Sequence, residues 1–230
     1  MRLFAVEALS VLRKVHDYKS LTKRLDISPS MISRYTHGKF LPNVERARRI
    51  LSLLNSEALE KIVRPLIVRS EGDYYELSKI VSDVRLQRFI ARLVCAEFAD
   101  AEIEKVLTVA TDGVPLAVLV ADELGVDVVI AKGRKEPYIS GYIEENLMRA
   151  PPIVEYLYIP RRSIKRGERV FIVDDILRSG KTIEALHRFV VRSGAELVGA
   201  FVIATIGRLR DKSNISFLRG RKLVTLVELT

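Results

Sequence analysis

The stretch Arg169–Thr182 constrains the fold more than any other part of the chain, and it reads R-V-F-I-V-D-D-I-L-R-S-G-K-T. Its run of four apolar residues, Val170–Val173, is typical of a central parallel strand that is buried on both faces. Asp174 and Asp175 follow the run, and a polar turn then leads into a helical pattern that starts near Thr182. This order predicts a strand, a ligand loop and a helix N-terminus, as in α/β folds.

The polar turn is predicted to bind an anion, because a loop that enters a helix presents unpaired N–H groups at the positive end of the helix dipole. Thr182 adds a hydroxyl donor. The carboxylates of Asp174 and Asp175 accept hydrogen bonds but cannot donate them, so they suit vicinal hydroxyls or a hydrated Mg²⁺. A phosphate site beside two acids indicates a sugar phosphate.

This stretch has two other interpretations. The tail S-G-K-T suggests a Walker A loop, but that motif requires a glycine five positions before Gly180, where this chain has Asp175. The ATPase interpretation is therefore rejected. The alternative that remains is a surface strand that ends in two solvated acids.

The segment V-F-I-V-D-D-I-L-R-S-G-K-T resembles the phosphoribosyl pyrophosphate (PRPP) binding motif of type I phosphoribosyltransferases. The resemblance implies that Asp174 and Asp175 hold the ribose hydroxyls, with Mg²⁺ accompanying bound PRPP. Where the family usually has a small hydroxyl residue, this chain has Arg178, which would tighten phosphate binding or alter the ligand. The residues implied to wrap the 5'-phosphate are Arg178, Ser179, Gly180, Lys181 and Thr182.

A second turn, Thr111-Asp112-Gly113-Val114-Pro115, separates an apolar strand pattern from a helical one. It resembles the pyrophosphate loop of the same family, which implies a ligand role for Thr111, Asp112 and Gly113. Taken alone, the turn is equally well an ordinary strand-to-helix connection. Because parallel α/β sheets bind ligands at the carboxyl ends of their strands, both loops are expected at the same edge of the sheet.

A basic segment, Lys132–Glu136, precedes a polar run that contains two tyrosines and extends to about residue 150. It resembles the basic residues and long flexible loop of orotate-type transferases. This resemblance makes Arg134 and Lys135 the candidate catalytic residues if the chain is an enzyme. The alternative is a solvated basic edge, since the family's K-x-H-G continuation is replaced by P-Y-I-S-G-Y. The segment 136–152 and the tail 216–230 are expected to cover the base.

Positive charge is concentrated in the first quarter of the chain, although the net charge of the whole is +9. Residues 1–64 contain 13 Lys and Arg against 6 Asp and Glu, whereas the other 166 residues contain 25 against 23. This asymmetry indicates a nucleic-acid-binding module joined to a nearly neutral one.

Apolar spacing predicts four helices in this basic part, beginning near residues 4, 20, 29 and 43. Asp26 stands at the turn, and Ser28-Pro29 forms an N-cap and first-turn pair. The pattern resembles the Cro/repressor class of helix-turn-helix domains, except that Asp26 replaces the usual turn glycine. The third helix is then expected in the major groove of double-stranded DNA. The residues expected to contact DNA are Ser28, Ser30, Ser33, Arg34, His37 and Lys39.

These patterns predict a small all-α helix-turn-helix domain over 1–64, a linker over 65–76 and a parallel-sheet, orotate-like type I phosphoribosyltransferase domain over 77–230. A basic helical unit that only oligomerises or binds a protein partner is the alternative for the first part. No apolar stretch reaches the roughly 18 residues that a membrane helix needs, and no signal peptide is recognised, so a cytoplasmic protein is expected. Scarce Gln and abundant Arg and Glu suggest a thermophilic source.

Two functions from different classes remain. The favoured one is a homodimeric, DNA-binding transcriptional regulator that senses PRPP, a nucleotide or a related sugar phosphate. Such fusions resemble bacterial purine repressors and archaeal sugar-catabolism regulators. The alternative is an active, PRPP-dependent phosphoribosyltransferase of orotate or purine type, which produces a nucleotide and pyrophosphate.

Overall fold

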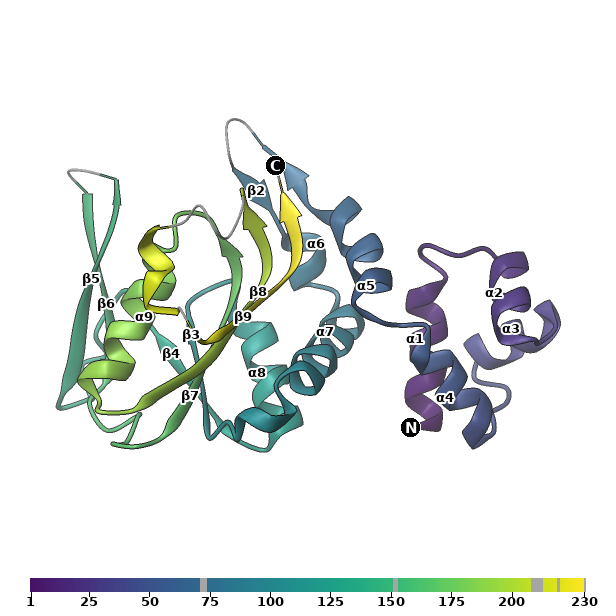
Figure 1. Ribbon diagram of the computed structural model, residues 1–230, viewed down its shortest axis with the longest axis horizontal. Helices are drawn as coiled ribbons and strands as arrows, with labels where there is room; N and C mark the ends of the chain where they lie inside the picture. Colours follow the sequence, from purple (N-terminus) through teal and green to yellow (C-terminus); the bar gives the residue numbers. More distant parts are fainter. Residues whose placement is uncertain (71–73, 151–152, 208–212, 219, 230) are drawn as a thin grey trace. The chain divides into compact units, whose positions relative to one another are not determined.

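The computed structural model describes residues 1–70, 74–150, 153–207, 213–218 and 220–229. The chain divides into two compact units, Met1–Leu93 and Val94–Thr230. The first is mainly helical, and the second is built around a parallel sheet (Figure 1). Within the described ranges, no helix is both long and apolar enough to span a membrane.

Five helices open the first unit, and each of the last four begins with a polar N-cap side chain that accepts a backbone hydrogen bond. Apolar residues of the first helix, including Leu9 and Leu12, are fully buried between its neighbours. The helices are α1 (Arg2–Leu12), α2 (Tyr18–Leu25), α3 (Pro29–Thr36), α4 (Val44–Ser52) and α5 (Ser56–Val63).

The turn between α2 and α3 has the conformation that the sequence predicts. Asp26 adopts the left-handed region with φ 54° and ψ 49°, which Asp tolerates better than most residues. Ser28 caps α3 by accepting a hydrogen bond from the Met31 N–H at 3.3 Å, and Pro29 occupies the first turn. Ile32 is fully buried, so α3 is fixed against the unit by its apolar face.

Residues 77–98 have the apolar spacing of a helix, but they do not form one continuous helix. The chain forms two helices that are separated at Ser82 and Asp83, because the Asp83 carboxylate accepts a hydrogen bond from the Leu86 N–H at 3.0 Å and starts the second one. The predicted linker also contains an antiparallel pair of short strands. The elements are β1 (Val68–Arg69), β2 (Tyr75–Glu76), α6 (Ser78–Val81) and α7 (Val84–Glu97), after a 3₁₀ turn at Arg64–Leu66.

The first part of α7 packs against α1. The rings of Phe4 and Phe89 stack with centroids 4.3 Å apart, and the Arg92 guanidinium lies 3.5 Å from the Phe4 ring centroid. Arg88 pairs with Glu7 at 3.1 Å. These contacts explain why the first compact unit extends to Leu93. The functional boundaries at residues 64 and 76 stay predictions.

The second unit contains a sheet of five parallel strands in the order β4-β3-β7-β8-β9, which confirms the α/β fold class. The last strand lies in a segment that the sequence suggested only as a tail. The strands are β3 (Lys105–Val109), β4 (Asp127–Ala131), β7 (Arg169–Leu177), β8 (Glu196–Ile206) and β9 (Lys222–Leu229).

Helices pack against the strands of this sheet, as all-parallel sheets require. Helix α9 (Lys181–Arg192) contributes five buried side chains to the core cluster that contains Ile172 and Val202. Successive side chains of a strand point to opposite faces, so Phe171 faces away from that cluster. The centroid of its ring lies 4.5 Å from that of the Phe98 ring. Helix α8 (Val114–Leu124) packs against β3, β4 and β7.

A separate antiparallel hairpin is formed by β5 (Tyr142–Ala150) and β6 (Ile153–Pro160). The expectation of a loop over 136–152 is therefore wrong for residues 142–150, and β6 does not join the parallel sheet. Residues 151 and 152 lie outside the described residues. The inward positions of β5 are Ile143, Glu145 and Leu147, and the charge at the middle one conceals the period-two pattern of a strand.

Candidate functional site

The two predicted ligand loops lie at the carboxyl ends of β3 and β7, which are adjacent and parallel. From β3 the chain continues to β4 on one side, and from β7 it continues to β8 on the other. The gap between β3 and β7 is therefore the topological switch point of the sheet, where open α/β folds bind their ligands. The structure thus brings Asp112 and Gly113 together with Asp174 and Asp175.

Gly113 is the point of closest approach between the loops. A Cβ atom added there would lie 2.8 Å from the Thr108 hydroxyl, 2.9 Å from the Asp174 carboxylate and 3.3 Å from the Asp174 Cα atom. The backbone of Gly113 is an ordinary right-handed one, with φ −72°, so the glycine is required for space rather than for conformation. Thr108 is a fully buried neighbour that sequence reasoning missed, because only the fold brings it to Asp174.

Replacing Gly113 with alanine should destabilise the second unit by about 1–3 kcal/mol, the usual effect of overpacking a tight site. Because the added methyl group also displaces Asp174, ligand affinity should fall with stability. Urea unfolding would measure the first effect. The variant Gly133→Ala is a matched control, since a Cβ there has no neighbour within 4 Å among the described residues. Equal stability of both variants would contradict the steric account.

Three carboxylates converge at the switch point. The Asp175 N–H donates to the Asp174 carboxylate at 3.0 Å, and Asp174 is only 3% exposed. Burial raises the pKa of Asp175 above its ordinary value, and the nearby charge of Asp112 raises it further, while hydrogen bonds from its surroundings act in the opposite direction. The ionised form of Asp175 is therefore disfavoured in this acidic site, and a ligand with hydroxyl donors, or a cation, would stabilise it.

The predicted phosphate loop covers residues 178–182, and its first three residues connect β7 directly to α9. Gly180 is buried and left-handed, with φ 83°, so a residue other than glycine would be strained there. Ser179 is exposed, and its hydroxyl accepts a long hydrogen bond of 3.5 Å from the Lys181 N–H. Arg178, Lys181 and Thr182 are each half-buried at this helix entrance.

Both helices that start at these loops lack a side-chain N-cap. Glycine occupies the N-cap position of each, Gly113 for α8 and Gly180 for α9, and neither position provides a capping side chain. In contrast, Asp17, Ser28 and Asn43 cap α2, α3 and α4. The first-turn N–H groups of α8 and α9 thus form an arrangement suited to binding phosphate or pyrophosphate.

The basic segment lies beyond β4 and next to the hairpin. Its start is tied to β6, since the N–H and C=O groups of Lys132 pair with those of Tyr158. Lys135 forms an ion pair with Glu144 of β5 at 2.9 Å, which raises the pKa of its ammonium group, and it also lies 4.7 Å from the Tyr158 ring centroid. Arg134 is exposed. Lys135 is therefore already engaged by the hairpin.

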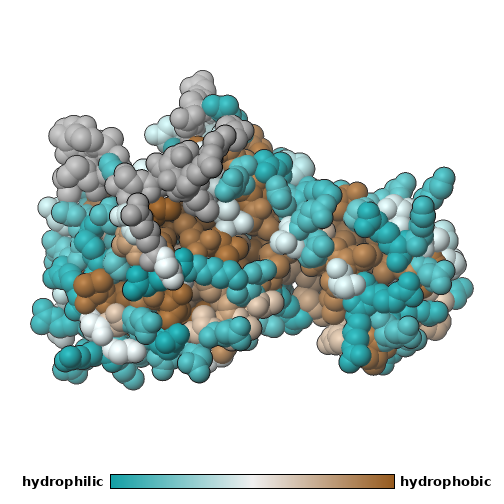
Figure 2. All heavy atoms as spheres, viewed as in Figure 1, coloured by the Kyte–Doolittle hydropathy of each residue, from teal (hydrophilic) through white to brown (hydrophobic). Residues whose placement is uncertain are grey.

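The residues predicted to contact DNA gather on and just after α3. Ser28, Ser30, Arg34, His37 and Lys39 are exposed, and Ser33 is half-buried. The hydroxyl oxygens of Ser28 and Ser30 are 3.0 Å apart, and the Nδ1 atom of His37 forms a hydrogen bond of 2.7 Å with the Ser33 carbonyl oxygen. Hydrophilic residues cover much of the helical unit on the face shown in Figure 2.

Exposed apolar side chains next to α3 were missed by the sequence reasoning. Phe40 is 55% exposed, and its ring centroid lies 5.7 Å from the Arg34 guanidinium. Leu41 and Val44 are also exposed. Phe40 could have been found from the sequence, because it directly follows the polar turn after α3, close to Arg34, one of the residues expected to contact DNA.

Residues 76–228 match the phosphoribosyl transferase domain family, and the chain belongs to this family. It is also similar to transcriptional regulators. It is 34% identical over 135 residues to the probable purine biosynthesis transcriptional regulator PurR of Streptococcus pneumoniae serotype 4, covering 58% of this chain and 49% of that protein. It is 27% identical over 169 residues to the purine biosynthesis transcriptional repressor PurR of Bacillus subtilis, covering 72% and 57%. The chain thus spans about half the length of these curated relatives.

The fold is also that of solved phosphoribosyl transferases. The adenine phosphoribosyl transferase of Trypanosoma brucei, in complex with AMP, pyrophosphate and ribose-5-phosphate, superposes with a TM-score of 0.64. The similarity covers 75% of this chain and 81% of that one, at 23% sequence identity. At this level of identity the similarity establishes the fold of the second unit.

Proposed function

We propose that this protein is a DNA-binding transcriptional regulator whose phosphoribosyltransferase-like domain senses PRPP, a nucleotide or a related sugar phosphate. One observation carries the ligand assignment: two glycine-capped helix N-termini and three carboxylates meet at the switch point between β3 and β7. Similarity to purine biosynthesis regulators supports the regulatory role.

The ligand is oriented by the charges of the site. Asp174 and Asp175 accept hydrogen bonds from the ribose hydroxyls, and the N–H groups around Ser179 to Thr182 bind the 5'-phosphate. The N–H groups at Thr111 to Gly113 bind the pyrophosphate. Carboxylate oxygens suit Mg²⁺, so Asp174 and Asp175 would hold the ion through its hydration shell when PRPP is bound, and Mg²⁺ would neutralise the pyrophosphate charge.

The engagement of Lys135 supports a sensor rather than an enzyme. A basic residue that stabilises a leaving pyrophosphate must be available to it, whereas the Lys135 ammonium group is paired with Glu144. The departure at Arg178 also weighs against unmodified orotate chemistry. A sensor keeps the ligand site and does not need Lys135 to be available for catalysis.

DNA binding is assigned to the first unit. Helix α3 presents Arg34 for base contact, and the N-cap of α3 and the turn after it, with Ser28, His37 and Lys39, contact phosphates. Two such helices in a homodimer would read half-sites about one helical turn apart or at multiples of that spacing. Ligand binding would change the affinity of this dimer for its operator.

The test is fluorescence anisotropy of labelled DNA from upstream of the protein's own gene, at fixed salt, with and without PRPP, nucleotides and sugar phosphates. Sequence-selective binding that one of these ligands shifts would establish the regulator and identify its effector. DNA binding no stronger than to a scrambled sequence would overturn it. Pyrophosphate release from PRPP in the presence of nucleobases would then establish the transferase instead.

A further inference from the structure

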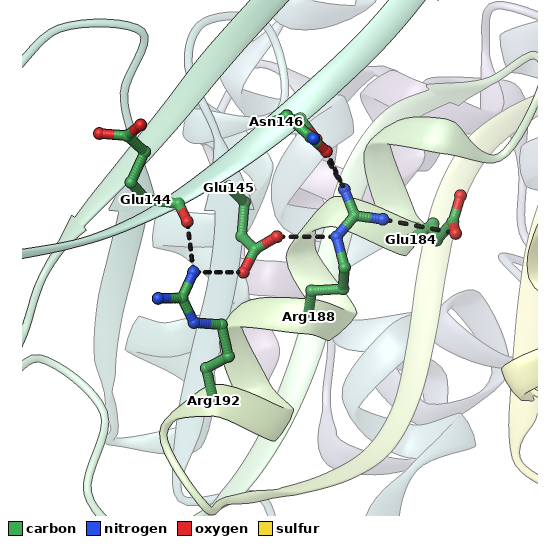
Figure 3. Close-up of polar contacts among 6 residues, drawn as sticks. All are labelled: Glu144, Glu145, Asn146, Glu184, Arg188 and Arg192. Carbon is green, nitrogen blue, oxygen red and sulfur yellow. Dashed lines mark hydrogen bonds and ion pairs between the residues drawn. The ribbon is translucent and has the colours of Figure 1, made fainter.

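A buried ion-pair cluster joins α9 to the β5–β6 hairpin. The side chain of Glu145 is 8% exposed. Its carboxylate accepts hydrogen bonds from the Arg188 Nε at 2.7 Å and from the Arg192 Nη1 at 2.9 Å. Figure 3 shows this carboxylate between the two guanidinium groups, both of which project from α9. A carboxylate buried to this extent is costly unless it is fully paired, so the cluster fixes β5 against the helix.

The same arginines also hold the backbone of β5. Arg188 donates from Nη2 to the Asn146 carbonyl at 2.6 Å, and Arg192 donates from Nη1 to the Glu144 carbonyl at 2.5 Å. Arg188 is oriented in turn by Glu184, one turn earlier on α9, at 3.4 Å. Three consecutive residues of β5 are thus attached to one helix.

The two ends of this arrangement are the predicted phosphate loop and the predicted basic segment. Helix α9 begins at the phosphate loop, directly after Gly180. On β5, the Glu144 side chain points away from the arginines (Figure 3) and pairs with Lys135. A continuous path therefore runs from the phosphate-binding end of α9, through the cluster and β5, to the basic segment after β4.

We propose that Glu145, Arg188 and Arg192 are positioning residues that fix the hairpin, and with it Lys135, relative to the phosphate loop. The proposal rests on the proposed function, because it assumes a phosphosugar at the start of α9. A ligand that orders the first turn of α9 then restrains β5, and the hairpin in turn contributes to ligand affinity. None of the three residues needs to touch the ligand.

The test combines PRPP titration by calorimetry, in the presence of Mg²⁺, with hydrogen exchange of the full chain. The variant Glu145→Gln keeps the shape of the side chain but removes its charge, and Arg192→Gln removes one of the two guanidinium groups. The control Glu196→Gln removes an equal charge from the partner of Arg169, at the start of β8 in the same unit.

In the wild-type chain, PRPP should slow amide exchange in residues 181–187 and also in residues 142–147. Both cluster variants should lose the second effect and keep the first, and their PRPP affinity should fall about tenfold, within the usual range of coupling between sites. The control should behave like the wild type. Wild-type affinity and wild-type protection of β5 in Glu145→Gln would overturn the proposal.

A failure of the proposed function would look different. If the wild-type chain binds neither PRPP nor a nucleotide nor a sugar phosphate, the sensor assignment is overturned, and the role of the cluster is then tested by hydrogen exchange of the chain without ligand. Faster exchange of residues 142–147 in Glu145→Gln, with residues 170–177 unchanged, would still establish the positioning role. Unchanged exchange in both segments would overturn it as well.

Discussion

Replacing Asp175 with asparagine should lower PRPP affinity by about 10- to 100-fold and at the same time make the folded protein more stable. The affinity falls because a charged acceptor for the ribose hydroxyls is lost, and hydrogen bonds to charged groups contribute about 1.5–3 kcal/mol. Stability rises because the fold holds this carboxylate in a buried site beside other acids, which raises its pKa.

The pH dependence gives the sign of the stability effect. Because the pKa of Asp175 is higher in the folded chain than in the unfolded chain, the folded state binds more protons between the two values. Stability therefore falls as the pH rises from the ordinary Asp value through the raised one, and the penalty remains at neutral pH. The advantage of Asp175→Asn should be present at pH 7 and absent well below pH 4, as measured by urea unfolding at both.

The exposed Asp122 of α8 provides a matched control. Asp122→Asn should change neither PRPP affinity nor the pH dependence of unfolding. If Asp175→Asn binds PRPP like the wild type, the assignment of the acidic pair to the ribose is wrong. If it is less stable than the wild type at pH 7, the carboxylate is better compensated in the fold than its surroundings indicate.

Replacing Arg34 with alanine should weaken binding to operator DNA by about 1–3 kcal/mol and relax the preference for one base pair. The guanidinium lies on the exposed face of α3, next to the Phe40 ring, where it can form two hydrogen bonds with guanine. The measurement is anisotropy with operators that vary at single positions. Lys39→Ala should instead weaken binding to all DNA sequences equally. It should also reduce the salt dependence of the affinity by the amount expected for about one phosphate contact.

Arg64 offers a control for the loss of positive charge. It is exposed on the helical unit, but it pairs with Glu60 at 2.8 Å and does not lie on α3. Arg64→Ala should therefore leave base preference unchanged. If Arg34→Ala discriminates between operator variants as well as the wild-type chain does, another residue reads the bases, and the exposed Phe40 is the next candidate.

Local chemistry made much of this molecule predictable. The side chains of Asp26 and Ser28 favour the conformation and the capping role that these residues have, and Gly180, which lacks a Cβ atom, tolerates a left-handed conformation. The turn before α3 and the loop before α9 could therefore be inferred from the sequence. The buried run Val170–Val173 predicted the central strand for a similar reason, because a strand covered on both faces must be apolar throughout.

The features that could not be predicted depend on contacts between distant segments. Strand β5 was missed because Glu145 stands at an inward position, and its partners Arg188 and Arg192 follow more than 40 residues later. The requirement for Gly113 was also hidden, since Thr108 and Asp174 approach it only after β3 and β7 pair. Asp83 divided an apolar pattern that otherwise fitted one helix.

The glycine N-caps of α8 and α9 have a consequence for how a ligand can act on this protein. Helices that carry their own capping side chains have the same ends in every state, whereas the N-cap residues of these two have no such side chain, and the phosphate groups of a ligand would take its place. The ligand would complete two elements of secondary structure, and its departure would leave both with frayed first turns. The concentration of the effector would then determine how ordered the first turns of α8 and α9 are, with no rearrangement of the sheet required.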